Sequence, residues 1–102
     1  MTKVRLARTD DVLEGTLRRV EANGTAVCLA HVRGGGFYAV EDRCTHENVE
    51  LSGGDLLGTE IECPLHGSLF DVKTGDVCGL PANEPLRTYE VTVVGDDLVV
   101  DL

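Results

Sequence analysis

Two short loops of this chain each combine a cysteine with a histidine. The first is Cys44-Thr45-His46 and the second is Cys63-Pro64-Leu65-His66, with sixteen residues between them. Thiolate and imidazole ligands together select zinc, copper or iron–sulfur clusters rather than calcium or magnesium. The sequence therefore predicts a transition-metal centre that uses these two cysteines and two histidines.

Structural zinc is one use for such a ligand set, because Cys₂His₂ closes a tetrahedral site. Zinc sites usually group like ligands, as C-x₂₋₄-C and H-x₃₋₅-H, whereas each loop here mixes the two types. If the loops face each other, both cysteines can reach one metal and both histidines a second metal beside it. That is the arrangement of a Rieske [2Fe–2S] cluster, in which two histidines replace two cysteines on one iron.

The elements that must position these loops are predicted to be short strands. Alternating apolar segments separated by Gly-rich and Asn-Gly turns are typical of strands and hairpins. The fold class is therefore all-β, an antiparallel β-sandwich or barrel. We expect strands at residues 3–7, 16–21, 25–32, 37–40, 59–62, 68–72, 89–94 and 98–102, and one helical turn within 10–13.

The two loops lie in a segment of different composition. Residues 43–58 are rich in Gly, Asp, Glu and Ser, and a proline-bounded loop occupies residues 81–85. A chain of 102 residues is near the commonest size of one domain. We expect a single domain over residues 1–102, with a ligand-bearing subdomain of loops and short strands at about 42–85 inserted between sheet strands.

Composition excludes several classes of function. The net charge is −9, and residues 41–80 alone carry nine acids against two bases. Binding to a phosphate backbone depends on Lys and Arg, so a nucleic-acid partner is not expected. Acidic side chains around the ligand loops suit steering toward basic protein partners, although they would also serve solubility alone.

No membrane role is expected either. The longest apolar stretch is far shorter than the roughly 20 residues that span a bilayer, and the N-terminus has no signal-peptide pattern. We expect a soluble, cytoplasmic protein, in which thiols stay reduced and available to metal.

The two loops resemble the two boxes of the Rieske family, C-x-H and C-x-x-H-G, at about their usual separation. Ser68-Leu69-Phe70-Asp71, Thr74-Gly75 and Leu80-Pro81-Ala82 resemble the segments after the second box in bacterial Rieske-type ferredoxins. The resemblance covers residues 37–102 well and the N-terminal strands loosely. It implies one Rieske-type [2Fe–2S] cluster per chain, with Pro81 in a loop that shields it. Cys44 and Cys63 would hold the inner iron, and His46 and His66 the outer iron near solvent.

Departures from the family pattern favour a low-potential member. High-potential respiratory Rieske proteins carry an extra cysteine in each box, joined as a disulfide, where this chain has Val49 and Leu65. They also carry a hydrogen-bonding tyrosine where this chain has Phe70. Fewer donors leave the reduced cluster less stabilised, although Ser68 matches a hydrogen-bonding serine of the family. We expect a potential at the low end of the Rieske range of about −150 to +300 mV.

The resemblance implies a ferredoxin that carries single electrons and is not itself an enzyme. An oxygenase would need a separate 2-His-1-carboxylate iron, and only His31 is unassigned. Its expected partners are a flavin-dependent ferredoxin reductase and the terminal oxygenase of a multicomponent ring-hydroxylating dioxygenase, which a monomer would dock transiently. The alternatives are iron–sulfur assembly or another redox pathway, a small subunit like that of nitrite reductases, and a zinc-stabilised binding module.

The remaining cysteines and histidine have simpler interpretations. Cys28 is expected to face the core as a small apolar side chain, and a disulfide between Cys28 and Cys78 is not expected in a reducing compartment. His31 stands at the end of a strand and is expected to be exposed and not a ligand. Gly53, Gly54 and Gly67 are expected to let the backbone come close to the cluster.

Overall fold

The described residues form eleven short strands and two 3₁₀ turns. The computed structural model describes residues 2–46, 48–80, 82 and 84–102. All eight strand pairings recorded among them are antiparallel, which confirms the predicted all-β fold class. The elements are β1 (Lys3–Arg8), η1 (Thr9–Asp11), β2 (Thr16–Ala22), β3 (Thr25–Val32), β4 (Gly36–Glu41), η2 (Leu51–Gly53), β5 (Asp55–Leu57), β6 (Glu60–Glu62), β7 (Leu69–Asp71), β8 (Val77–Gly79), β9 (Thr88–Tyr89), β10 (Thr92–Val94) and β11 (Asp97–Asp101).

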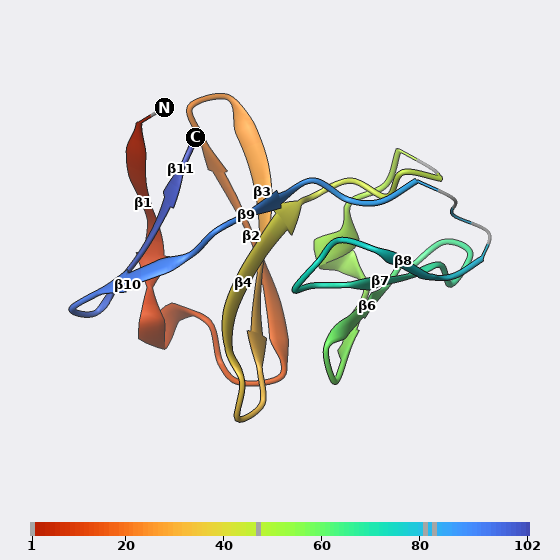
Figure 1. Cartoon of the computed structure of the whole chain (residues 1–102), viewed down its shortest axis with the longest axis horizontal. Helices are drawn as coiled ribbons and strands as arrows, with labels where there is room; N and C mark the ends of the chain where they lie inside the picture. Colours follow the sequence, from red (N-terminus) through yellow and green to blue (C-terminus); the bar gives the residue numbers. More distant parts are fainter. Residues whose placement is uncertain (1, 47, 81, 83) are drawn as a thin grey trace.

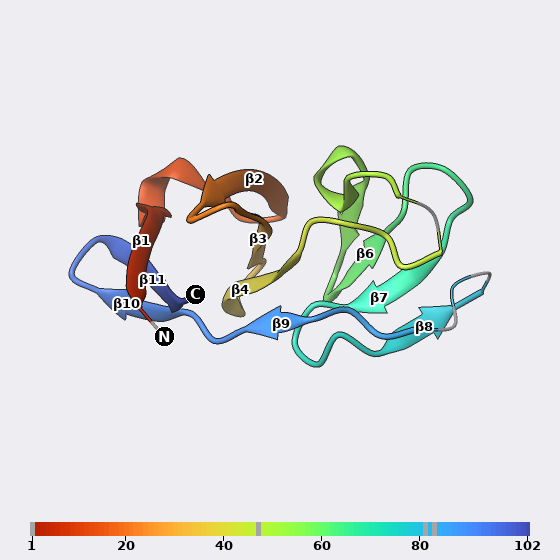
Figure 2. The same cartoon turned by 90° about the horizontal axis from the view of Figure 1, so that it is seen from above.

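The strands are arranged in three sheets. Their strand orders are β1-β11-β10, β2-β3-β4-β9 and β5-β6-β7-β8. Both views show the second sheet between the other two, with the third sheet at the end of the molecule away from the two termini (Figure 1, Figure 2). The third sheet is built from the segment that contains the second ligand loop, so that loop lies in this distal part of the molecule. Among the residues described above, no helix is long and apolar enough to cross a membrane.

Strand β3 holds the three sheets together because it is buried on both faces. Successive side chains of a strand point to opposite faces. Val27 and Leu29 pack into a core between the first and second sheets, whereas Cys28, Ala30 and Val32 pack into a second core shared with the ligand loops. This double burial explains why β3 is a continuous apolar run rather than an alternating one. Cys28 is fully buried, as predicted.

The turn between β2 and β3 follows the sequence signal closely. Asn23 and Gly24 have φ values of 51° and 75°, so both are left-handed. Two left-handed central residues are typical of the type I′ hairpin, for which Asn-Gly is the preferred sequence. The hairpin therefore has the register expected from its two-residue loop.

The prediction of one strand over residues 89–94 is wrong. Tyr89 in β9 pairs with Ala39 in the second sheet, whereas Thr92 in β10 pairs with Val99 in the first sheet. The chain crosses from one sheet to the other between these two residues. Apolar periodicity is the same on both sides of the crossing, so the sequence gives no sign of it.

Candidate metal centre

The first ligand loop leaves the second sheet at the end of β4. The N–H of Asp42 still donates to the carbonyl of Ala26, at 3.1 Å, so the sheet pairing extends one residue beyond the strand. The N–H of Cys44 then donates to the carbonyl of Val49 at 2.9 Å and closes the loop. Cys44 is fully buried beneath this loop, whereas His46 is exposed.

The second ligand loop connects β6 to β7. The N–H of Cys63 donates to the carbonyl of Ser68 at 2.8 Å, and the N–H of Gly67 donates to the carbonyl of Cys63 at 3.1 Å. Gly67 has φ 76°, a left-handed conformation that glycine adopts without strain. This tight loop leaves Cys63 only 2% exposed and His66 exposed.

The two loops bring the four predicted residues together in two pairs. The ring centroids of His46 and His66 are 5.5 Å apart, and Cys44 and Cys63 lie in the same buried cluster. Within residues 2–46, 48–80, 82 and 84–102, no three His, Cys, Asp or Glu side chains form a group that could hold one metal ion. A buried pair of sulfurs beside an exposed pair of imidazoles fits two adjacent irons better than one tetrahedral zinc.

The environment of the sulfurs also fits a highly charged metal core. Burial raises the pKa of Cys63, and the neighbouring Cys44 thiol raises it further, although the backbone N–H groups of Leu65 and His66 act in the opposite direction. Metal ligands are thiolates rather than thiols. A nearby metal cation would favour the Cys63 thiolate, and metal binding would release the proton of this thiol.

A third segment is hydrogen-bonded to both ligand loops. The Ser68 hydroxyl accepts a hydrogen bond from the N–H of Ala82 at 3.1 Å, and the Thr45 hydroxyl donates to the carbonyl of Glu84 at 2.6 Å. The role of Thr45 could not be predicted from the sequence, because nothing local indicates a partner 39 residues away. Pro81, to which the family resemblance assigned a shielding role, lies outside the described residues.

Replacing Thr45 with valine should detach this segment from the first ligand loop. We expect the free energy of unfolding to decrease by about 0.5–1.5 kcal/mol, the usual net contribution of one hydrogen bond. We also expect faster amide hydrogen exchange in residues 84–86. Thr16→Val is a matched control, because its hydroxyl also donates to a carbonyl at 2.6 Å, that of Leu13, outside the ligand loops. Equal exchange of residues 84–86 in both variants would contradict the expected role of Thr45.

His31 differs from its prediction. It is half-buried rather than exposed, its Nδ1 lies 2.7 Å from the carbonyl oxygen of Val12, and its ring stacks on Phe37 with centroids 3.9 Å apart. Phe37 is at the start of β4, whereas Cys44 follows the end of that strand. His31 therefore stabilises the far end of the second sheet and lies apart from the ligand loops.

The two other cysteines are both free thiols. Cys28 is buried in the core and Cys78 is exposed, with its sulfur 3.6 Å from the carbonyl oxygen of Asp76. The structure thus contains no disulfide between Cys28 and Cys78. Among the described residues, neither thiol belongs to a group of side chains that could hold a metal ion.

The three antiparallel sheets and the two mixed Cys/His loops define a Rieske-type iron–sulfur domain. Residues 2–90 match the family model described as the Rieske [2Fe-2S] domain, and the chain belongs to this family. Its cofactor is accordingly a Rieske-type [2Fe–2S] cluster.

Three of the similar proteins are named as ferredoxins of dioxygenase systems or come from a ferredoxin complex. The chain is 42% identical over 103 residues to the 3-phenylpropionate/cinnamic acid dioxygenase ferredoxin subunit of Escherichia coli K12, covering 100% of this chain and 95% of that protein. Its structure is similar to the ferredoxin of carbazole 1,9a-dioxygenase from Nocardioides aromaticivorans IC177, with a TM-score of 0.92, 35% identity and 98% and 97% coverage of the two chains. A chain in a complex of reduced oxygenase and oxidized ferredoxin in carbazole 1,9a-dioxygenase gives a TM-score of 0.90, 39% identity and 96% and 91% coverage.

Proposed function

We propose that this protein is a one-electron carrier, not an enzyme, that delivers electrons to a terminal ring-hydroxylating oxygenase. The observation that carries the proposal is the exposed pair His46 and His66, whose rings lie 5.5 Å apart, while the cysteines of the same two loops are buried. A Rieske cluster, when bound, supplies reversible one-electron chemistry. The relatives support the choice of partner, since they are named as ferredoxins of dioxygenase systems and one is described in complex with its oxygenase.

The ligand set is part of this proposal. Cys44 and Cys63 would hold the inner iron, and His46 and His66 the outer iron. Burial of the sulfurs and exposure of the imidazoles support a centre whose histidine end faces solvent. An electron would therefore enter and leave through that end. The cluster-binding subdomain would span about residues 42–85 of a single domain over 1–102.

The electron donor would be a flavin-dependent ferredoxin reductase, docked transiently at the same histidine end. Four free thiols suit a reducing compartment, so a cytoplasmic location belongs to the same proposal. An iron–sulfur assembly pathway would use the same cluster but a different acceptor. The direct test is single-turnover reduction of a purified terminal oxygenase by the reduced protein. The reaction is monitored by the absorption change as the cluster of this protein becomes oxidised. No electron transfer to any ring-hydroxylating oxygenase would argue for the assembly pathway.

The rate of that reaction should decrease as salt concentration rises. Residues 41–80, which contain the ligand loops, carry nine acids against two bases. Attraction between such a surface and a basic partner is screened by salt, since the Debye length falls from about 30 Å at 0.01 M to about 10 Å at 0.1 M. Stopped-flow measurement over this range is the check, with an uncharged chemical reductant of the same cluster as control. A rate independent of salt would show that acidic steering is wrong.

The reduction potential should lie at the low end of the Rieske range. Phe70 is fully buried and offers no hydroxyl, and Val49 and Leu65 cannot form a disulfide between the boxes. The Ser68 hydroxyl, which accepts from Ala82 at 3.1 Å, still has its own hydrogen to donate. We expect a voltammetric midpoint below about +150 mV, in the lower part of the family range. Phe70→Tyr should raise it by adding a donor, and a wild-type midpoint above that value would refute the expectation.

A further inference from the structure

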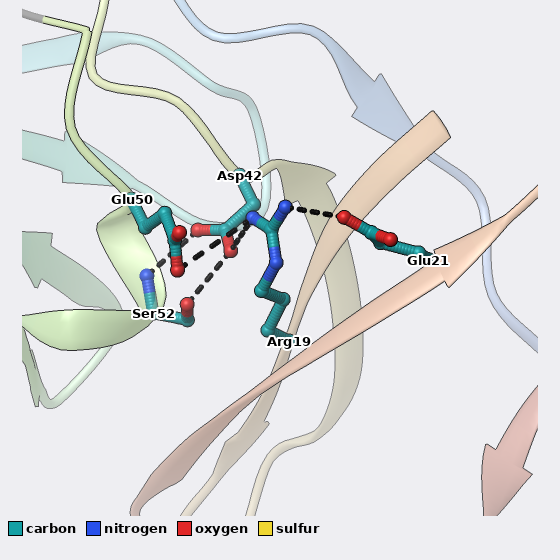
Figure 3. Close-up of polar contacts among 5 residues, drawn as sticks. All are labelled: Arg19, Glu21, Asp42, Glu50 and Ser52. Carbon is teal, nitrogen blue, oxygen red and sulfur yellow. Dashed lines mark hydrogen bonds and ion pairs between the residues drawn. The ribbon is translucent and has the colours of Figure 1, made fainter. Parts of the chain in front are cut away.

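A buried carboxylate connects the second sheet to the segment between the ligand loops (Figure 3). Asp42 lies two residues before Cys44, and its side chain has no exposed surface. Its Oδ1 accepts a hydrogen bond from the N–H of Ser52 at 2.7 Å. Its Oδ2 accepts one from the Ser52 hydroxyl at 2.7 Å and one from Nη1 of Arg19 at 2.8 Å. This carboxylate is thus buried and hydrogen-bonded at both oxygens, and an arginine lies against it, which is the condition for a stable buried charge.

Arg19 supplies the compensating charge from another strand of the second sheet. It lies in β2, and its Nη2 also contacts Glu21 at 2.7 Å while Nη1 lies 3.8 Å from Glu50. The side chains of Glu21 and Glu50 are 68% and 61% exposed, so water screens those two contacts. Asp42 is therefore the acidic partner that water does not screen and for which the positive charge of Arg19 matters most. Figure 3 shows the guanidinium of Arg19 between the carboxylates of Asp42 and Glu21.

The turn that contains Ser52 also contacts the second ligand loop. A Cβ atom on Gly54 would lie 1.9 Å from the carbonyl oxygen of Glu62 and 3.2 Å from Cδ of Pro64. Glu62 and Pro64 are the two neighbours of Cys63 in the chain. The short segment from Ser52 to Gly54 is thus hydrogen-bonded to Asp42, two residues before Cys44. It is also packed against the residues on both sides of Cys63. Its position sets how far apart the two ligand loops lie.

We propose that Arg19 and Asp42 are positioning residues of the redox centre that also set its reduction potential. Asp42, through Ser52, fixes the separation of the ligand loops, and Arg19 balances a negative charge held two residues from a cluster ligand. The proposal rests on the ligand set proposed above, but not on the oxygenase partner. An unbalanced carboxylate near the centre opposes the gain of an electron, and loss of the carboxylate favours it.

The sign of the potential shift tests this proposal. Arg19→Gln should lower the midpoint potential of the purified, cluster-loaded protein, and Asp42→Asn should raise it. We expect each shift to correspond to about a threefold change in the reduction equilibrium, or about 28 mV at 59 mV per tenfold for one electron. Two controls should stay near the wild-type value: Arg19→Lys, which keeps the charge, and Glu21→Gln, which removes only the exposed partner.

A purely structural link would give a different pattern. In that case Arg19→Gln and Asp42→Asn would both shift the potential in the same direction, or neither would shift it, and either result overturns the proposal. If Asp42→Asn cannot hold a cluster, Arg19→Gln and Arg19→Lys decide the question, since equal potentials of these two overturn it. Failure of the proposed ligand set is separate, because the wild-type protein would then lack the absorption and electron paramagnetic resonance spectra of a Rieske cluster.

The positioning role has its own readout. Ser52→Ala removes one hydrogen bond from Asp42 without removing a charge. We expect faster amide hydrogen exchange in the peptide over residues 42–50, with little change in potential. Exchange equal to that of the wild type would overturn the positioning role and leave only the electrostatic one.

Discussion

Cys63→Ala is expected to abolish cluster binding. The purified variant should lack the visible absorption bands and the electron paramagnetic resonance signal of a Rieske centre. Its iron content should fall at least about tenfold, because loss of even an outer partner of a metal ligand costs about 10–100-fold in affinity. Cys63 is 2% exposed, so no water can readily replace the lost sulfur, and Cys44 alone cannot hold the inner iron.

Cys78→Ala is the matched control for this variant. Cys78 is also a free cysteine of the distal part of the molecule, but it is exposed and hydrogen-bonds only outside the ligand loops. It should keep the full iron content and the wild-type spectrum. A Cys63→Ala protein that retained two irons would refute the ligand set, and a colourless wild-type protein with one bound zinc would revive the zinc-stabilised module.

The candidate ligands could be predicted because their signal is local. Each loop places a cysteine and a histidine within four residues, and the mixed order in both loops already favours two metals over one. The contacts that hold the loops could not be predicted in this way. Asp42 is one of nine acids between residues 41 and 80, and its burial depends on Arg19, which lies 23 residues earlier in the chain.

The strands show the same division between local and distant causes. β3 was predictable because six of its eight residues are apolar, five of them consecutive. β5 and β8 were missed because their sequences carry no clear strand signal of their own, and the pairing with β6 and β7 that forms them is a tertiary contact. The division of the last long strand into β9 and β10 likewise depends on which sheet each half meets.

The expectation that the backbone at Gly54 comes close to the cluster stays a prediction, whereas the structure shows a different close neighbour. The sequence indicated that the backbone comes close to another group at this position, and named the cluster as that group. In the structure the close neighbour is the backbone of Glu62, the residue before Cys63. A glycine marks a close approach, but only the tertiary structure identifies the partner.

Gly54→Ala should therefore destabilise the protein strongly. The φ of Gly54 is −91°, which alanine can adopt, so the cost comes from the clash alone. The added Cβ would lie 1.9 Å from the carbonyl oxygen of Glu62, and backbone at this site must move. We expect the free energy of unfolding to decrease by about 2–3 kcal/mol, at the upper end of the usual cost of overpacking. That corresponds to a decrease in Tm of roughly 10–20 °C for a domain of this size, measured by thermal unfolding.

Gly53→Ala separates this clash from the general effect of a methyl group in the same turn. Its Cβ would meet only Cγ of Pro64, at an ordinary distance of 3.9 Å, so its Tm should change by a few degrees at most, roughly what 0.5 kcal/mol would give. Because the displaced backbone leads directly into Cys63, Gly54→Ala should also release iron faster than Gly53→Ala. Equal Tm values and equal rates of iron release in the two variants would show that the turn is not tightly packed against the second ligand loop. The separation of the two ligand loops would then have to be set elsewhere in the fold.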